Sequence, residues 1–240
     1  MKYLIFIGGF ACIMFAFAFS NKSVIGIINN PSDTIHFPGE THFNNVQQLT
    51  FGGDNAEAYF SYDGKNLVFQ KTDTKNGIAC DQIWMGKLPT TPSEKFNPKL
   101  VSTGTGRTTC AFFYPDGKHI LYGSTHLGNK ECPPVPDRKK YGNKYIWAVY
   151  DDFDIFKADT NGNIVKRLTK TKGYDAEATI SPKGDLIVFT SMRDGDLELY
   201  TMNINGKKVK RITNTLGYDG GAWFSPDGTK IIWRASRPKT

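Results

Sequence analysis

Residues 222–228 read AWFSPDG, and three related segments stand earlier in the chain: AYFSYDG at 58–64, AFFYPDG at 111–117 and ATISPKG at 178–184. Each copy is followed at the same offset by an apolar run, which in the last copy is Ile231-Ile232-Trp233. Because the copies share one register, they identify an internal repeat. The last two copies stand 44 residues apart, which falls in the range of about 40–45 residues that is typical of propeller blades.

Each repeat predicts four antiparallel strands. In the last copy, Pro226 presets φ, Asp227 caps the turn and Gly228 takes the left-handed position, so the first two strands form a tight hairpin. Residues 197–202 alternate apolar and polar side chains as a half-buried third strand does. Asn205-Gly206 is a hairpin turn that leads into a fourth strand. We therefore expect an all-β fold, a β-propeller of four-stranded antiparallel blades.

These repeats resemble those of TolB-like β-propellers. The resemblance covers residues 46–240 and is carried by SPDG at 225–228, IVFTS at 187–191, DLELYTM at 196–202 and RIT at 211–213. The first copy departs from the pattern, because Tyr62 stands where proline is usual. The resemblance implies a six- or seven-bladed propeller. It also implies a scaffold role outside the cytoplasm, in contact with other envelope components.

The strand count predicts a propeller that is incomplete, with about three and a half blades. We place the blades at about 54–101, 107–169, 174–213 and 218–240, with an insertion at 127–152 in the second. The last blade brings only two strands, at 222–225 and 230–234, although the segment at about 45–50 could supply a closing strand. We expect an open arc in which the first and last blades share no sheet.

The N-terminus predicts export. Residues 1–20 form a signal peptide, with Lys2 before an apolar run and small residues at its end, and residues 21–45 form an N-terminal segment. An uncleaved anchor is the alternative; after cleavage, stable membrane insertion is not expected. We expect a periplasmic or secreted protein. The net charge of +7 does not predict a nucleic-acid partner, because the lysines are scattered and the protein is exported.

Aligned positions at the start of the first strand and after the second strand of each repeat, on the face opposite the repeated turn, predict a ring around one mouth of the propeller channel. The candidate binding residues of this ring are Glu57, His126, Asp175, Glu177, Arg193 and Asp219. They could bind a ligand, a peptide end or a divalent cation. The alternative, favoured for Asp175 and Asp219, is that these side chains brace the loops between blades. For Glu177 and His126 both interpretations stay open.

The sequence contains no catalytic motif and no candidate nucleophile, cofactor site or metal site. We therefore predict a non-catalytic scaffold for an envelope or secreted protein partner or a ligand. The alternative is a propeller part of a hydrolase or polysaccharide lyase, in which His126 serves as the acid–base group and Arg193 binds an anion.

Aromatic residues recur in the first strand of the repeats. Tyr59, Phe112 and Trp223 occupy one aligned position, where we expect them to pack blade against blade rather than to stack sugars. Trp147 belongs instead to the insertion, within the apolar run 145–150. That run either packs against the propeller or is exposed and binds a partner.

Export places the cysteines in oxidising surroundings, so the three that follow the signal peptide should not all be free. We expect a disulfide between Cys110 and Cys132, in preference to Cys80–Cys110, with the remaining cysteine unpaired.

Overall fold

The computed structural model describes residues 39–43, 46–91, 93–142, 144 and 146–238. The chain divides into two units, Met1–Gln48 and Leu49–Thr240. The predicted signal peptide lies outside the described residues, and so does the predicted N-terminal segment apart from residues 39–43. No helix in the described ranges has the length and apolarity needed to cross a membrane.

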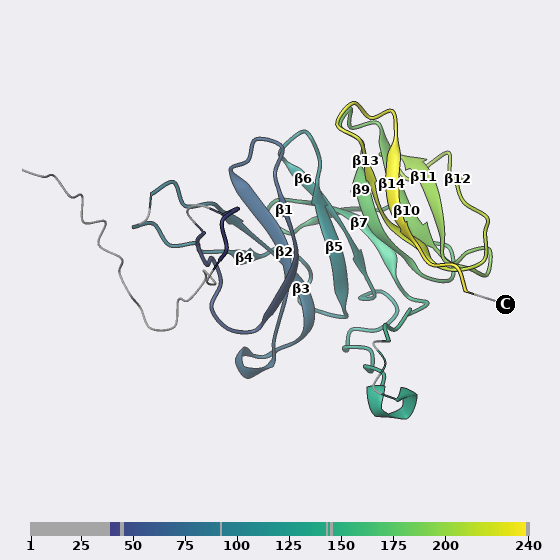
Figure 1. Ribbon diagram of the computed structural model, residues 1–240, viewed down its shortest axis with the longest axis horizontal. Coiled ribbons are helices and arrows are strands. Elements are labelled where there is room, and N and C mark those ends of the chain that lie inside the picture. Colours follow the sequence, from purple (N-terminus) through teal and green to yellow (C-terminus); the bar gives the residue numbers. More distant parts are fainter. Residues whose placement is uncertain (1–38, 44–45, 92, 143, 145, 239–240) are drawn as a thin grey trace, which may run out of the picture. The chain divides into compact units, whose positions relative to one another are not determined.

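The second unit repeats one sheet along the chain, and the strands of each sheet lie in sequence order (Figure 1). Blade one contains β1 (Asp54–Phe60), β2 (Asn66–Asp73), β3 (Ile78–Lys87) and β4 (Lys99–Leu100). Blade two contains β5 (Thr108–Phe113), β6 (His119–Ser124), β7 (Asp154–Asp159) and β8 (Ile164–Arg167). Blade three contains β9 (Asp175–Ile180), β10 (Leu186–Ser191), β11 (Glu198–Asn203) and β12 (Lys210–Arg211). Blade four contains β13 (Asp219–Phe224) and β14 (Ile231–Ala235).

The repeated turn builds the hairpin between the first two strands of each blade. In blade four, the backbone N–H of Gly228 donates to the carbonyl of Ser225 at 2.8 Å, and Gly228 has a φ of 70°. Asp227 accepts from the N–H of Thr229 at 3.0 Å. The left-handed glycine and the capping carboxylate are the features on which the sequence prediction of this turn depended.

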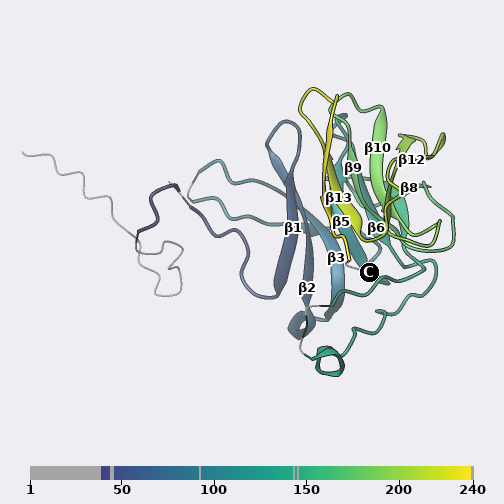
Figure 2. The ribbon, with the colours of Figure 1, turned by 45° about the vertical axis from the view of Figure 1, so that its right-hand side comes forward.

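Apolar side chains from neighbouring blades form the core. Val68 and Ile83 of blade one are buried in one cluster with Phe113 of blade two. A second cluster joins blades two and three, and a smaller one joins Val188 of blade three to Ala222 of blade four. Figures 1 and 2 show the first strands β5, β9 and β13 side by side, which agrees with their contacts. Each blade is therefore held mainly by the faces of its neighbours.

The structure confirms the all-β fold of four-stranded antiparallel blades and its incomplete last blade. β14 pairs with β13, and Ile232 on β14 is 72% exposed. Within the described residues, blades one and four share no sheet, and residues 46–50 form no strand. Two short 3₁₀ turns also occur among the described residues, η1 (Thr74–Asn76) and η2 (Arg138–Tyr141).

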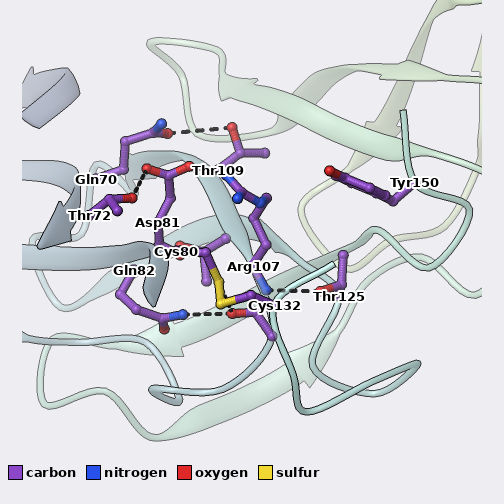
Figure 3. A network of polar contacts seen from close by, with 12 residues as sticks. Gln70, Thr72, Cys80, Asp81, Gln82, Arg107, Thr109, Thr125, Cys132 and Tyr150 are labelled. Carbon is purple, nitrogen blue, oxygen red and sulfur yellow. Dashed lines mark hydrogen bonds and ion pairs between the residues drawn. A yellow bond between two sulfur atoms is a disulfide. The ribbon is translucent and has the colours of Figure 1, made fainter. Parts of the chain in front are cut away.

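The predicted disulfide is wrong in one of its partners. Cys132 is bonded to Cys80 rather than to Cys110, which is free (Figure 3). The start of the insertion follows the loop before β5, since the N–H of Gly106 donates to the carbonyl of Lys130 at 2.7 Å. The side chain of Gln82 on β3 also reaches Gly106, at 2.8 Å. These bonds bring the insertion against β3, where Cys80 lies.

Candidate functional site

A bulge interrupts the first strand of every blade at the same aligned position. The four residues there have left-handed backbones: Glu57 (φ 50°), Cys110 (φ 48°), Glu177 (φ 54°) and Gly221 (φ 59°). The pairing of the first two strands shifts register at this point in each blade. Because the bulge turns these side chains away from the regular alternation of the strand, they converge on one pocket.

The pocket lies between the first strands of the blades and has a volume of about 470 Å³. Its wall includes the four bulge residues, with Gln70 and Thr109 beside them. Tyr218, Trp147 and Arg234 also line it. A cavity of this size suits a small molecule or a side chain of a protein partner.

Aromatic side chains pack together at the pocket's base. Trp223 lies 4.9 Å from Tyr59 and 5.1 Å from Phe112, measured between ring centroids. The three rings come from the first strands of blades four, one and two. They pack blade against blade, as the sequence indicated, and two of them, Tyr59 and Trp223, also line the pocket.

Glu177 is 6% exposed and joins blade three to blade four. Its Oε2 accepts from the hydroxyl of Thr190 at 2.8 Å, the hydroxyl of Tyr218 at 2.9 Å and the N–H of Gly221 at 2.9 Å. Burial raises the pKa of Glu177, while these donors oppose the rise. The residue therefore has a bracing role as well as a place in the pocket wall.

Glu57 is the exposed carboxylate of the ring. The hydroxyl of Tyr59 donates to its Oε2, and the Sγ of Cys110 lies 3.9 Å from the same oxygen. Burial, followed by the charges of Glu177 and Glu57, raises the pKa of the Cys110 thiol well above its usual range. Burial and the bond to Glu57 likewise raise the pKa of Tyr59. Both groups are thus neutral at physiological pH.

Asp175 and Asp219 belong to ion pairs within their own blades. Arg193 lies 3.0 Å from Asp175, and Arg237 lies 2.8 Å from Asp219. The indole N–H of Trp233 also donates to Asp219, at 2.8 Å. Both aspartates are thus engaged within their own blades, by arginine and indole partners. Neither aspartate lines the pocket.

His126 stands apart from the other candidates. Its Nδ1 shares a 2.9 Å hydrogen bond with the hydroxyl of Ser124, and its ring centroid lies 4.5 Å from that of Phe156. Burial is the main cause that lowers the pKa of His126. The structure thus brings Glu57 and Glu177 together in the pocket wall, and leaves His126 and Arg193 with separate partners outside it. The described residues contain no group of three potential ligands suited to a metal ion.

Sequence reasoning missed several pocket residues. Tyr218 was passed over, although it recurs with Tyr174 in a Gly-Tyr-Asp motif that drew attention only to its aspartate. Arg234 carried no sequence signal of its own, and its guanidinium lies 5.0 Å from the ring centroid of Tyr218. Trp147 of the insertion is 45% exposed and contacts Tyr218 edge-on at 5.8 Å. The insertion therefore contributes to the rim of the pocket.

A network beside the pocket fixes the junction of blades one and two (Figure 3). Arg107 lies 2.6 Å from Asp81, which also accepts from the hydroxyl of Thr72 at 2.7 Å. The hydroxyl of Thr109 donates to Gln70 at 3.4 Å. Because Gln70 and Thr109 line the pocket, this network holds part of its wall.

Comparison with known proteins agrees with the fold. Residues 142–239 match the family described as the TolB beta propeller domain. TolB from Acinetobacter baumannii has a TM-score of 0.54 at 20% identity, over 78% of this chain and 39% of that chain. The nidogen/laminin complex gives 0.53 at 13% identity, over 74% of this chain and 55% of that chain. The hydrazine synthase of Kuenenia stuttgartiensis has a TM-score of 0.52 at 15% identity, over 76% of this chain and 29% of that chain.

This chain thus spans 39% of the length of the first of these structures. At these identities the likeness concerns the fold alone. No curated protein matches the chain significantly.

Proposed function

Because this chain is built from TolB-like β-propeller repeats, we propose that it is an exported, non-catalytic scaffold that binds an envelope or secreted partner through the pocket. Export is supported by the signal-like N-terminal sequence and by the Cys80–Cys132 bridge, which suits an oxidising compartment. The binding role is supported by the pocket wall.

The observation that carries the proposal is the backbone strain at the bulges. Glycine adopts the left-handed conformation freely, and blade four uses Gly221 there. Blades one to three place Glu57, Cys110 and Glu177 at the same position, and a side chain in this conformation costs about 1–2 kcal/mol. A purely structural bulge would favour glycine in every blade. Glu177 receives three donors that offset its cost. Glu57 is exposed and, among the described residues, is held only by the Tyr59 hydroxyl and the more distant Cys110 thiol, so its side chain is best explained by binding.

The enzyme alternative has no comparable support. It assigned acid–base work to His126 and anion binding to Arg193. Neither side chain lines the pocket, and Arg193 is engaged by Asp175. No observation therefore favours a hydrolase or lyase over a binding scaffold.

Affinity capture from envelope extract tests the proposal. The full-length exported protein is immobilised beside three variants: Glu57→Gln and Trp147→Ala in the pocket, and Glu131→Gln as an exposed control outside it. We expect a partner that is retained by the parent protein and the control and lost from both pocket variants. Equal retention by all four proteins would contradict pocket binding. A hydrolytic or lyase activity that is lost in His126→Ala would contradict the non-catalytic role.

A further inference from the structure

We infer that the pocket takes a primary ammonium group on an alkyl stem, of the kind that a lysine side chain of the partner presents. The inference rests on the proposed function, because it names the group that the same pocket would bind. It is argued from the charges of the wall and from the aromatic rings.

The two carboxylates stand on either side of Cys110 along the ring. Cys110 occupies the bulge of blade two, between the bulge of Glu57 in blade one and that of Glu177 in blade three. Three donors converge on Oε2 of Glu177, whereas its Oε1 receives only the hydroxyl of Tyr218, at 3.1 Å, among the described residues. In Glu57, no described residue donates to Oε1. Each carboxylate therefore keeps an oxygen for a ligand that brings its own donors.

The charge of the pocket is only partly balanced from within. Among its lining residues, Glu57 and Glu177 are the two acidic groups and Arg234 is the single cation, whose charge opposes the rise in the pKa of Glu177. Arg234 lies over the ring of Tyr218 at the rim. The raised pKa values of Cys110, Tyr59 and Tyr218 keep these groups uncharged. An anionic ligand would meet two carboxylates, whereas an ammonium group supplies the missing positive charge.

The rings suit a cation on an apolar stem. Tyr59 and Trp223 lie together at the base, and Trp147 stands at the rim. Aromatic faces attract an ammonium group and also pack against methylene groups. A lysine side chain combines the two features, because its point charge is carried on a flexible stem.

The test is a titration of the full-length exported protein at constant ionic strength, followed by calorimetry and by tryptophan fluorescence, since Trp147 and Trp223 line the pocket. The probes are Nα-acetyl-lysine methylamide, its Nε-acetylated form, cadaverine and glycine amide. We expect the lysine probe to bind and the Nε-acetylated form to bind at least about tenfold more weakly. Cadaverine binding as tightly as the lysine probe would assign the pocket to free amines. Preference for glycine amide would overturn the alkyl stem.

The variants separate this inference from the proposed function. Glu57→Gln should weaken the lysine probe by about tenfold, and Glu131→Gln should leave it unchanged. Equal binding of the two acetyl-lysine probes, or no effect of Glu57→Gln, would overturn the inference. Capture of a partner that requires Glu57 without any binding of the lysine probe would refute the ammonium assignment and keep the scaffold. Binding of the lysine probe without a captured partner would refute the scaffold and keep the ammonium assignment.

Discussion

The bulge of blade one allows a direct measurement of the strain on which the proposal depends. Alanine and glycine at position 57 both remove the carboxylate and its bond to Tyr59, so they differ mainly in the backbone. In an ordinary strand position, glycine is less stable than alanine by roughly 0.5–1 kcal/mol. At φ 50° the order reverses, because the Cβ of alanine is strained there. We expect Glu57→Gly to be more stable than Glu57→Ala by about 1 kcal/mol.

The assay is equilibrium urea unfolding of both variants, with the free energy of unfolding compared at equal m-values. Position 55 is the matched control, because it is exposed in the same strand and its backbone is not left-handed. At position 55, the Asn55→Ala variant should be more stable than the Asn55→Gly variant. If alanine is also the better residue at position 57, the bulge is not strained, and the inference that Glu57 is kept for binding loses its basis.

Three further predictions concern stability and association. Cys132→Ala should lower the free energy of unfolding by about 4 kcal/mol on chain-entropy reasoning, because the bridge to Cys80 spans 52 residues; a loss below about 1 kcal/mol in urea unfolding would contradict this. Burial lowers the pKa of His126, so the unfolded state binds its proton first, and stability should fall as the pH drops below about 6.5. In His126→Asn that part of the fall should disappear from unfolding curves recorded across this range. Ile232→Thr should reduce concentration-dependent self-association in sedimentation velocity, since this apolar side chain is exposed on β14, which pairs only with β13 among the described residues; unchanged association would show that this surface is not involved.

The fold was predictable because its signals are local. The turn residues, the alternation along 197–202 and the Asn-Gly turns each favour the same hairpin geometry in every copy. The pocket was predictable only in part. Aligned residues of a repeat occupy equivalent places around its axis, and Glu57 and Glu177 share the pocket for this reason. The other four residues predicted for the ring, His126, Asp175, Arg193 and Asp219, do not line it.

The bulge was harder to predict because only one copy shows it. Glycine at position 221 signals a left-handed backbone, while Glu57, Cys110 and Glu177 conceal the same conformation. The disulfide was misplaced for a different reason. Cys132 belongs in sequence to blade two, but the insertion lies against β3 of blade one, where Cys80 is. Side-chain direction in an irregular strand and the path of an insertion therefore limit what sequence alone can decide.

A recurring clamp at the outer strands gives a last prediction. In blade three, Arg211 lies 2.8 Å from Glu198 and donates to the carbonyl of Thr213, whose hydroxyl accepts from the N–H of Leu199 at 2.9 Å. Blade one has the same arrangement without charged residues. Gln82 stands in place of the acid, Leu100 in place of the arginine and Ser102 in place of the threonine. The hydroxyl of Ser102 donates to Gln82 at 2.8 Å.

Blade three thus has both the acid and the arginine, and blade one has neither. This is expected if a buried carboxylate is tolerated only together with its positively charged partner. Glu198 is 1% exposed, so Arg211→Leu alone should lower the free energy of unfolding. Adding Glu198→Gln, which copies blade one, should recover part of that loss in urea unfolding. If the double variant is instead less stable than the single one, the two blades do not share one joint, and the paired exchange has another cause.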